Sequence, residues 1–133
     1  MRIKRFNNFK INESNNQKSI YKVLDNPFLK VIAQDAGVEF LRNENPDELG
    51  PALLEACKVF FEQFTTQYPK GSEERMFFDY LHNLCKNEYE YKVPASLSEA
   101  EDLDENALHI FEELVSGRKF YIDKFLEGAY EEK

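Results

Sequence analysis

The chain has 133 residues, of which 42% are hydrophobic and 14% aromatic, and its formal net charge is −8. A chain of this length and apolar content can bury one core unaided, and it lacks the ~18 consecutive apolar residues of a membrane-spanning helix. Cys57 and Cys85 lie far apart and His is scarce, which argues against a disulfide framework or a zinc site. We therefore expect one soluble, intracellular domain with core thiols and no membrane contact.

The first eighteen residues are basic and then polar. Four of the first ten are Lys or Arg, and Ile3, Phe6 and Phe9 recur at a spacing typical of one side of a helix. Residues 12–18, "NESNNQK", have the amide-rich composition of a linker. The chain is therefore divided into a cleavable basic arm with its linker, residues 1–18, and an acidic helical domain, residues 19–133.

The opening residues Met1-Arg2, Phe6, Phe9 and Ile11-Asn12-Glu13 resemble the N-terminal capsid-targeting peptides of internal proteins in T-even-like bacteriophages. In those peptides a basic residue follows Met, aromatics lie a turn apart, and the prohead protease cuts after an apolar-x-Glu tripeptide. The resemblance implies cleavage after Glu13, packaging in the virion, and delivery into the host cytoplasm, where such proteins counter defence enzymes. A frayed basic arm, a first amphipathic turn docked on the acidic body, and a mitochondrial transit peptide are open alternatives.

Capping signals predict two helices after the linker. Asp25-Asn26-Pro27 places a capping side chain before a proline suited to the first helical position, so a helix is expected from Phe28 to about Gly37. Asn45-Pro46-Asp47-Glu48 repeats that signal. Because Gly50-Pro51 follows so soon, we expect one introductory turn there, and then a main helix over 51–68.

Three more helices are predicted in the second half of the chain. Ser72 should cap one that runs to about Tyr91, before Pro94. The next is expected over 103–116, closed by Gly117, and the last over 119–130. Because no alternating Val/Ile/Thr pattern occurs, strands are not expected in quantity. The chain is therefore predicted to be all-α, a single bundle of about five helices.

Each predicted helix carries one apolar face when its residues are placed at 100° intervals. On the 51–68 helix, Val59 falls on the side opposite that face. The faces should meet in one core, whose predicted members include Phe60, Phe64, Phe78, Leu81, Phe111 and Leu114.

An acidic strip after the 72–91 helix is the main candidate binding surface, and Tyr89 and Tyr91 place aromatic rings near it. Acidic and aromatic groups together suit a basic protein surface, the chemistry of inhibitors that occupy nucleic-acid sites. A solvated face that only confers solubility is the other interpretation. The strip comprises Glu99, Glu101, Asp102, Asp104, Glu105, Glu112 and Glu113.

The sequence gives less support to a catalytic site or a metal site than to a binding surface. A di-metal carboxylate site in a bundle needs two Glu-x-x-His pairs and two further Glu, whereas Asp79-x-x-His82 occurs once. His109 lies with Glu105 and Glu112 on the polar side of its helix, away from the core. We therefore expect no catalytic residue, no metal and no cofactor.

The favoured function is inhibition of a host protein by a small acidic, non-enzymatic, phage-encoded binding module. The host protein acts in defence or binds nucleic acid, and the module would bind the basic surface of that host protein. Because the folded domain is acidic, with nine Lys/Arg against twenty-one Asp/Glu over residues 43–133, direct nucleic-acid binding by it is disfavoured. An internal or accessory structural virion protein is the alternative, and a metal-dependent bundle enzyme using His82 and His109 ranks third. The sequence leaves the partner's identity and the oligomeric state open.

Overall fold

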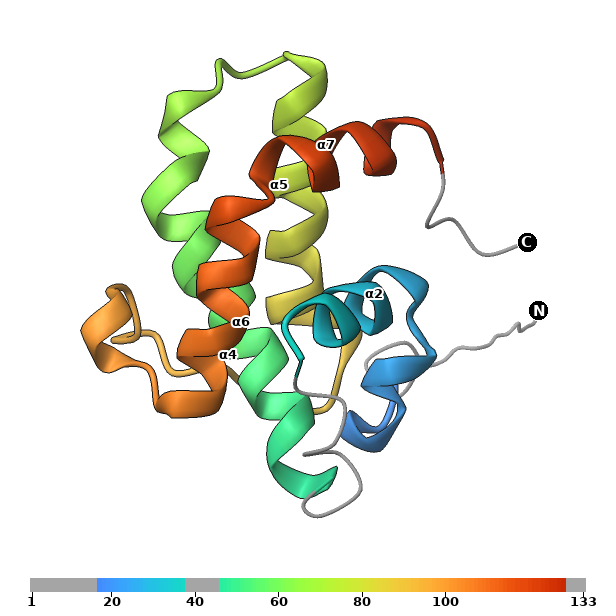
Figure 1. Ribbon diagram of the computed structural model, residues 1–133, viewed down its shortest axis with the longest axis vertical. Coiled ribbons are helices and arrows are strands. Elements are labelled where there is room, and N and C mark those ends of the chain that lie inside the picture. Colours follow the sequence, from blue (N-terminus) through green and yellow to red (C-terminus); the bar gives the residue numbers. More distant parts are fainter. Residues whose placement is uncertain (1–16, 38–45, 129–133) are drawn as a thin grey trace, which may run out of the picture.

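A computed structural model describes residues 17–37 and 46–128 of the chain. These residues form helices joined by short connections, so the predicted all-α bundle is confirmed (Figure 1). The elements, including short 3₁₀ helices and one π-helical turn (η4), are η2 (Ile20–Asp25), α2 (Pro27–Asp35), α4 (Pro46–Phe64), η3 (Thr65–Gln67), α5 (Glu73–Asn83), η4 (Leu84–Glu88), η5 (Ala100–Asp102), α6 (Glu105–Ser116) and α7 (Arg118–Leu126).

Helix α4 is the centre of the bundle. It forms an antiparallel pair with α5, and α6 lies along α4 (Figure 1). Helix α7 crosses α5, where Phe125 contacts the rings of Phe77 and Tyr80. The helix η2 packs on the first turns of α4. Because η2, α5 and α6 pack on several sides of α4, even Val59 is 0% exposed, so its predicted position away from the core is wrong. A helix enclosed in this way is apolar on more than one face.

The predicted capping residues begin their helices as expected. The Asn26 side chain accepts a hydrogen bond from the Leu29 N–H at 3.1 Å, and Pro27 occupies the first turn of α2. The Ser72 hydroxyl accepts the Arg75 N–H at 3.3 Å, which starts α5. Helix α6 begins at Glu105, two residues later than predicted, because Asp104 caps it.

The break predicted at Gly50-Pro51 is wrong, because α4 runs continuously from Pro46 to Phe64. Pro51 lies near the start of the helix, where its missing N–H removes a single hydrogen bond. Gly50 is buried under η2, and a Cβ added there would lie 2.7 Å from Ile20 Cγ1. The glycine therefore permits close packing of η2 on α4, a role that its sequence neighbours do not reveal.

The helix predicted to reach Tyr91 ends earlier. After α5 the chain makes the π-helical turn η4 and then extends, and Tyr89 forms a parallel bridge with Lys18. The Lys18 N–H donates to the Glu88 carbonyl at 3.0 Å, and the Glu90 N–H donates to the Lys18 carbonyl at 2.9 Å. Lys18, expected at the end of the linker, is thereby attached to the domain.

The predicted core is confirmed with one change at its edge. Phe60, Phe78, Leu81, Phe111 and Leu114 belong to one buried cluster, and Phe64 is partly exposed and packs against it. Helix α7 ends at Leu126, and residues 129–133, which include the predicted end of that helix, lie outside the described residues. Residues 1–16 of the predicted arm and linker also lie outside them. In the described part of the chain, no helix has the length and apolar composition that a bilayer crossing demands.

Candidate functional site

Six of the seven predicted strip residues form an exposed acidic surface. They lie at the start of η5 and on it, on the turn into α6 and along one side of α6. The chain has no Lys or Arg between Val93 and Gly117. In the described part of the chain, none of the six forms an ion pair with Lys or Arg. We call these residues the acidic surface: Glu99, Glu101, Asp102, Asp104, Glu105 and Glu112.

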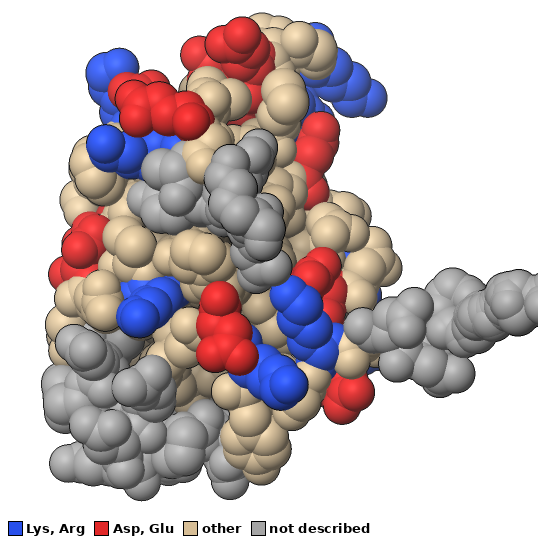
Figure 2. All heavy atoms as spheres, turned by 90° about the vertical axis from the view of Figure 1, so that its right-hand side faces the viewer, with Lys and Arg blue, Asp and Glu red and all other residues tan. Residues whose placement is uncertain are grey.

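The other side of the molecule differs in charge. Figure 1 places η5 on the side of the bundle away from α2 and η2. The face on the α2 and η2 side carries Lys and Arg interspersed with Asp and Glu (Figure 2). The acidic surface therefore differs from this face, where charges of both signs are mixed.

Two members of the acidic surface also hold its backbone in place. The Asp102 carboxylate accepts hydrogen bonds from the N–H groups of Ser98 and Glu99, at 3.3 and 3.2 Å. The Asp104 carboxylate accepts the Ala107 N–H at 2.9 Å and caps α6. Changing either residue would disturb the fold as well as the charge, so Glu101, Glu105 and Glu112 are the residues on which charge can be tested separately.

The seventh predicted residue, Glu113, does not belong to the acidic surface, which corrects the expectation. It is half-buried, and its Oε2 accepts a hydrogen bond from the Tyr121 hydroxyl at 2.5 Å. The same hydroxyl lies 2.8 Å from Asp35 Oδ2, at the end of α2. Successive residues are rotated by about 100° around a helix axis, so the side chain of Glu113 is directed toward α7 and not to the side of Glu112.

Tyr89 and Tyr91 do not present their rings to a partner as expected. Tyr89 is only 2% exposed, because its pairing with Lys18 turns it toward the core. Tyr91 is half-buried, and its hydroxyl donates to the Glu55 carboxylate of α4. Burial, and then this hydrogen bond, raise the pKa of Tyr91 above its usual value. Both tyrosines therefore attach the 89–91 segment to the domain.

The residues considered for catalysis or metal binding stay apart. Within residues 17–37 and 46–128, no three His, Cys, Asp or Glu side chains gather as a metal site would require. Asp79, His82 and His109 are exposed on their helices, as the spacing predicted for His109. His82 lies against Phe61, with ring centroids 4.8 Å apart.

The two cysteines are core thiols, as predicted. Cys57 is fully buried, and that burial raises its pKa well above the usual value. Burial also raises the pKa of Cys85 to about 12, and its thiol donates to the Leu54 carbonyl at 3.4 Å. Both thiols therefore stay protonated at neutral pH, where a nucleophile would need the thiolate.

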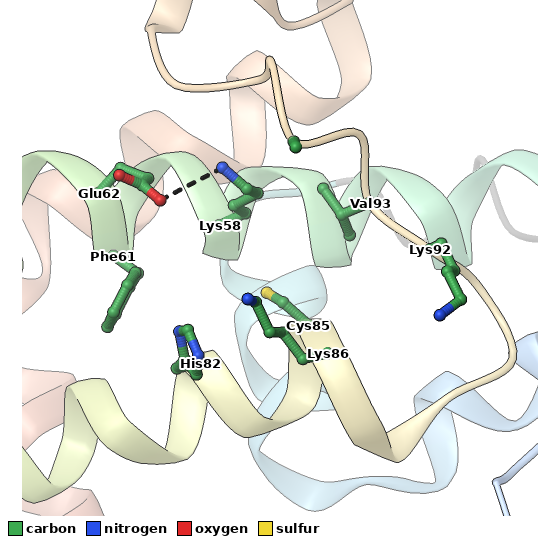
Figure 3. Close-up of a pocket in the computed structure, with 9 residues that line it drawn as sticks. Lys58, Phe61, Glu62, His82, Cys85, Lys86, Lys92 and Val93 are labelled. Atoms are coloured by element: carbon green, nitrogen blue, oxygen red, sulfur yellow. Dashed lines mark hydrogen bonds and ion pairs between the residues drawn. The ribbon is translucent and has the colours of Figure 1, made fainter. Parts of the chain in front are cut away.

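A hollow that the sequence did not suggest opens between α4, α5 and the segment after η4 (Figure 3). Its volume is about 380 Å³. The residues that line it come from separate parts of the chain, so the hollow forms only when α4 packs against α5. They comprise Lys58, Phe61, Glu62, His82, Cys85, Lys86, Lys92, Val93 and Ala95.

No protein-family model, curated protein sequence or solved structure matches this chain.

Proposed function

We propose that the protein is a non-enzymatic binding module whose acidic surface engages a protein with a basic surface. The observation that supports this most directly is the exposure of six carboxylates with no Lys or Arg partner among the described residues. Carboxylates that no Lys or Arg neutralises among the described residues are available to steer a basic protein into contact and to favour it over acidic ones.

The proposed partner is a host protein, one that acts in defence or binds nucleic acid, and the proposed source is a phage. The support for this source is the resemblance of residues 1–13 to capsid-targeting peptides. An internal or accessory structural role in the virion is the second proposal, because the same opening residues would direct a structural protein into the capsid. Inhibition ranks first because the acidic surface imitates the charge of a nucleic acid, which basic defence proteins bind.

The test compares two variants with the same net charge. The first carries Glu101→Lys, Glu105→Lys and Glu112→Lys on the acidic surface. The matched control carries Asp25→Lys, Asp79→Lys and Glu90→Lys, three exposed acids elsewhere. Each variant changes the net charge from −8 to −2, so a difference between them reports the position of the charges.

A partner captured from bacterial lysate by the unmodified protein supplies the binding assay. We expect the surface variant to bind at least ~10-fold more weakly, mainly through a slower on-rate, and the control to bind within about threefold of the parent. Circular dichroism checks that both variants fold. Equal weakening of both would point to overall charge alone, and unchanged binding by a folded surface variant would refute the acidic surface as the binding site.

A further inference from the structure

The hollow between α4 and α5 is basic in an acidic protein. Three lysines, Lys58, Lys86 and Lys92, line it with a single carboxylate, Glu62, whereas the whole chain has 17 Lys and Arg against 25 Asp and Glu. In the part of the chain that the structure describes, neither Lys86 nor Lys92 forms an ion pair. Their charge is therefore available to an anion that enters the hollow.

Lys58 forms a fixed wall of the hollow. Its side chain is only 13% exposed, and its Nζ donates to the Leu97 carbonyl at 2.7 Å and to Glu62 Oε2 at 3.3 Å. The bond to Leu97 holds the segment that follows Val93 against α4, whereas the pair with Glu62 lies within α4 (Figure 3). An ammonium group has three N–H donors, so one donor remains for a ligand.

The other walls suit a flat, apolar group. The Phe61 and His82 rings lie together, with centroids 4.8 Å apart and planes at 48°, and Val93 and Ala95 line the hollow as well. A volume of about 380 Å³ lies within the range of about 300–1,000 Å³ common to small-molecule sites, which combine apolar walls with a few placed polar groups.

We propose that the hollow binds a small phosphate-bearing molecule that carries a flat ring. Figure 3 shows the three ammonium groups pointing in different directions, so the phosphate contacts Lys86, which lies beside His82, and is attracted by the charge of Lys58 and Lys92. Lysine is an effective point-charge partner for phosphate. The ring lies against Phe61 and His82. This site is separate from the acidic surface, and the proposal stands independently of the proposed protein-binding function.

The first test uses phenyl phosphate as the probe and compares it with inorganic phosphate and benzoate by calorimetric titration at low salt. We expect saturable binding of phenyl phosphate with a Kd of about 1 mM or below, and at least ~5-fold weaker binding of inorganic phosphate, which lacks the ring. Benzoate separates a phosphate site from a general anion site. Benzoate binding as tight as that of phenyl phosphate would refute the preference for phosphate.

Two pairs of substitutions locate the charge contacts. The double variant Lys86→Ala with Lys92→Ala should weaken phenyl phosphate at least ~5-fold, whereas Lys30→Ala with Lys70→Ala should change it less than about twofold. All four lysines are exposed, and both variants have a net charge of −10. Equal effects from the two pairs would refute a defined site.

The ring contact is tested with His82→Ala. Because His82 is exposed, removing its imidazole ring should leave the fold intact. The variant should reduce the advantage of phenyl phosphate over inorganic phosphate by about threefold, because one of the two rings in the wall is lost. Phe61→Ala should reduce it further. An unchanged ratio in both variants, or no saturation by ~20 mM phenyl phosphate with the parent protein, would overturn the proposal.

Discussion

At the residue scale, the Tyr121 hydroxyl joins two carboxylates that belong to different helices. Its ring is fully buried, and its hydroxyl lies 2.8 Å from Asp35 Oδ2 and 2.5 Å from Glu113 Oε2. Gly117 makes room for the ring, since a Cβ there would lie 2.8 Å from Tyr121 Cε2. Burial, and then the bonds to Glu113 and Asp35, raise the pKa of Tyr121 far above its usual value.

Tyr121→Phe is expected to destabilise the protein by about 1–3 kcal/mol at pH 7. The substitution removes the hydroxyl that lies between the half-buried carboxylate of Glu113 and the exposed carboxylate of Asp35. It should also alter the dependence of stability on alkaline pH. In the unfolded chain a tyrosine loses its proton near pH ~10, whereas folded Tyr121 keeps it. The stability that this proton contributes is therefore present below pH ~10 and declines as the pH rises further.

Urea denaturation of the parent and the variant at pH 7 and at pH ~10.5 checks both expectations. The difference in unfolding free energy between the parent and Tyr121→Phe should be smaller at the higher pH. Tyr21→Phe is the control, because Tyr21 is 67% exposed. If Tyr121→Phe and Tyr21→Phe behave alike, the hydroxyl bridge does not stabilise the fold.

At the scale of elements, η2 and α4 meet so closely that one position between them tolerates only glycine. At Gly50 an added Cβ would lie 2.7 Å from the Ile20 side chain and 2.9 Å from the Ile20 carbonyl oxygen. Backbone cannot move aside as a flexible side chain can, so η2 would have to shift. The favourable helix propensity of alanine is therefore opposed by the contact between the two elements.

Gly50→Ala is expected to lower the free energy of unfolding by roughly 1–3 kcal/mol, although alanine favours an isolated helix by about 1 kcal/mol over glycine. Thermal or urea denaturation measures the change. Gln63→Ala, at an exposed position of the same helix, should change it by less than ~0.5 kcal/mol. Stabilisation by Gly50→Ala would show that η2 does not pack on α4 as described.

At the scale of the whole molecule, the bridge between Lys18 and the 88–90 segment attaches the first described residues to the rest of the domain. Two backbone hydrogen bonds, at 3.0 and 2.9 Å, and an ion pair with Glu88 at 3.4 Å hold Lys18 there. The bridge closes the bundle by attaching its first described residues to the turn that follows α5. Its loss should therefore weaken the whole domain.

Two truncations test this boundary. Removing residues 1–13 should leave the thermal midpoint within about a degree, because a detachable arm shares few buried contacts with its domain. Removing residues 1–18 should lower the stability by about 1–3 kcal/mol through the loss of two backbone hydrogen bonds. A large drop with the shorter truncation would refute the detachable arm, and equal midpoints would show that the Lys18 bridge is dispensable.

The sequence by itself determined the helical class, the capped starts of α2 and α5 and most of the core. These properties depend on local signals: the Asn26 and Ser72 side chains cap the N–H groups of the residues that follow them, and apolar residues recur with the helical period. It also placed Glu101, Glu105 and Glu112 correctly on an exposed face, because their positions on that side of the chain follow from local spacing.

Only the tertiary structure decided which faces are enclosed and which distant residues meet. Val59 is buried because α4 is central, and glycine is required at position 50 of α4 because η2 approaches the helix there. Glu113 is withdrawn from the acidic surface by Tyr121, and the basic hollow exists because α4 and η4 bring Lys58 and Lys86 to one place. Helical periodicity gives the direction of a side chain, whereas the element that lies in that direction is set by the packing of the whole chain.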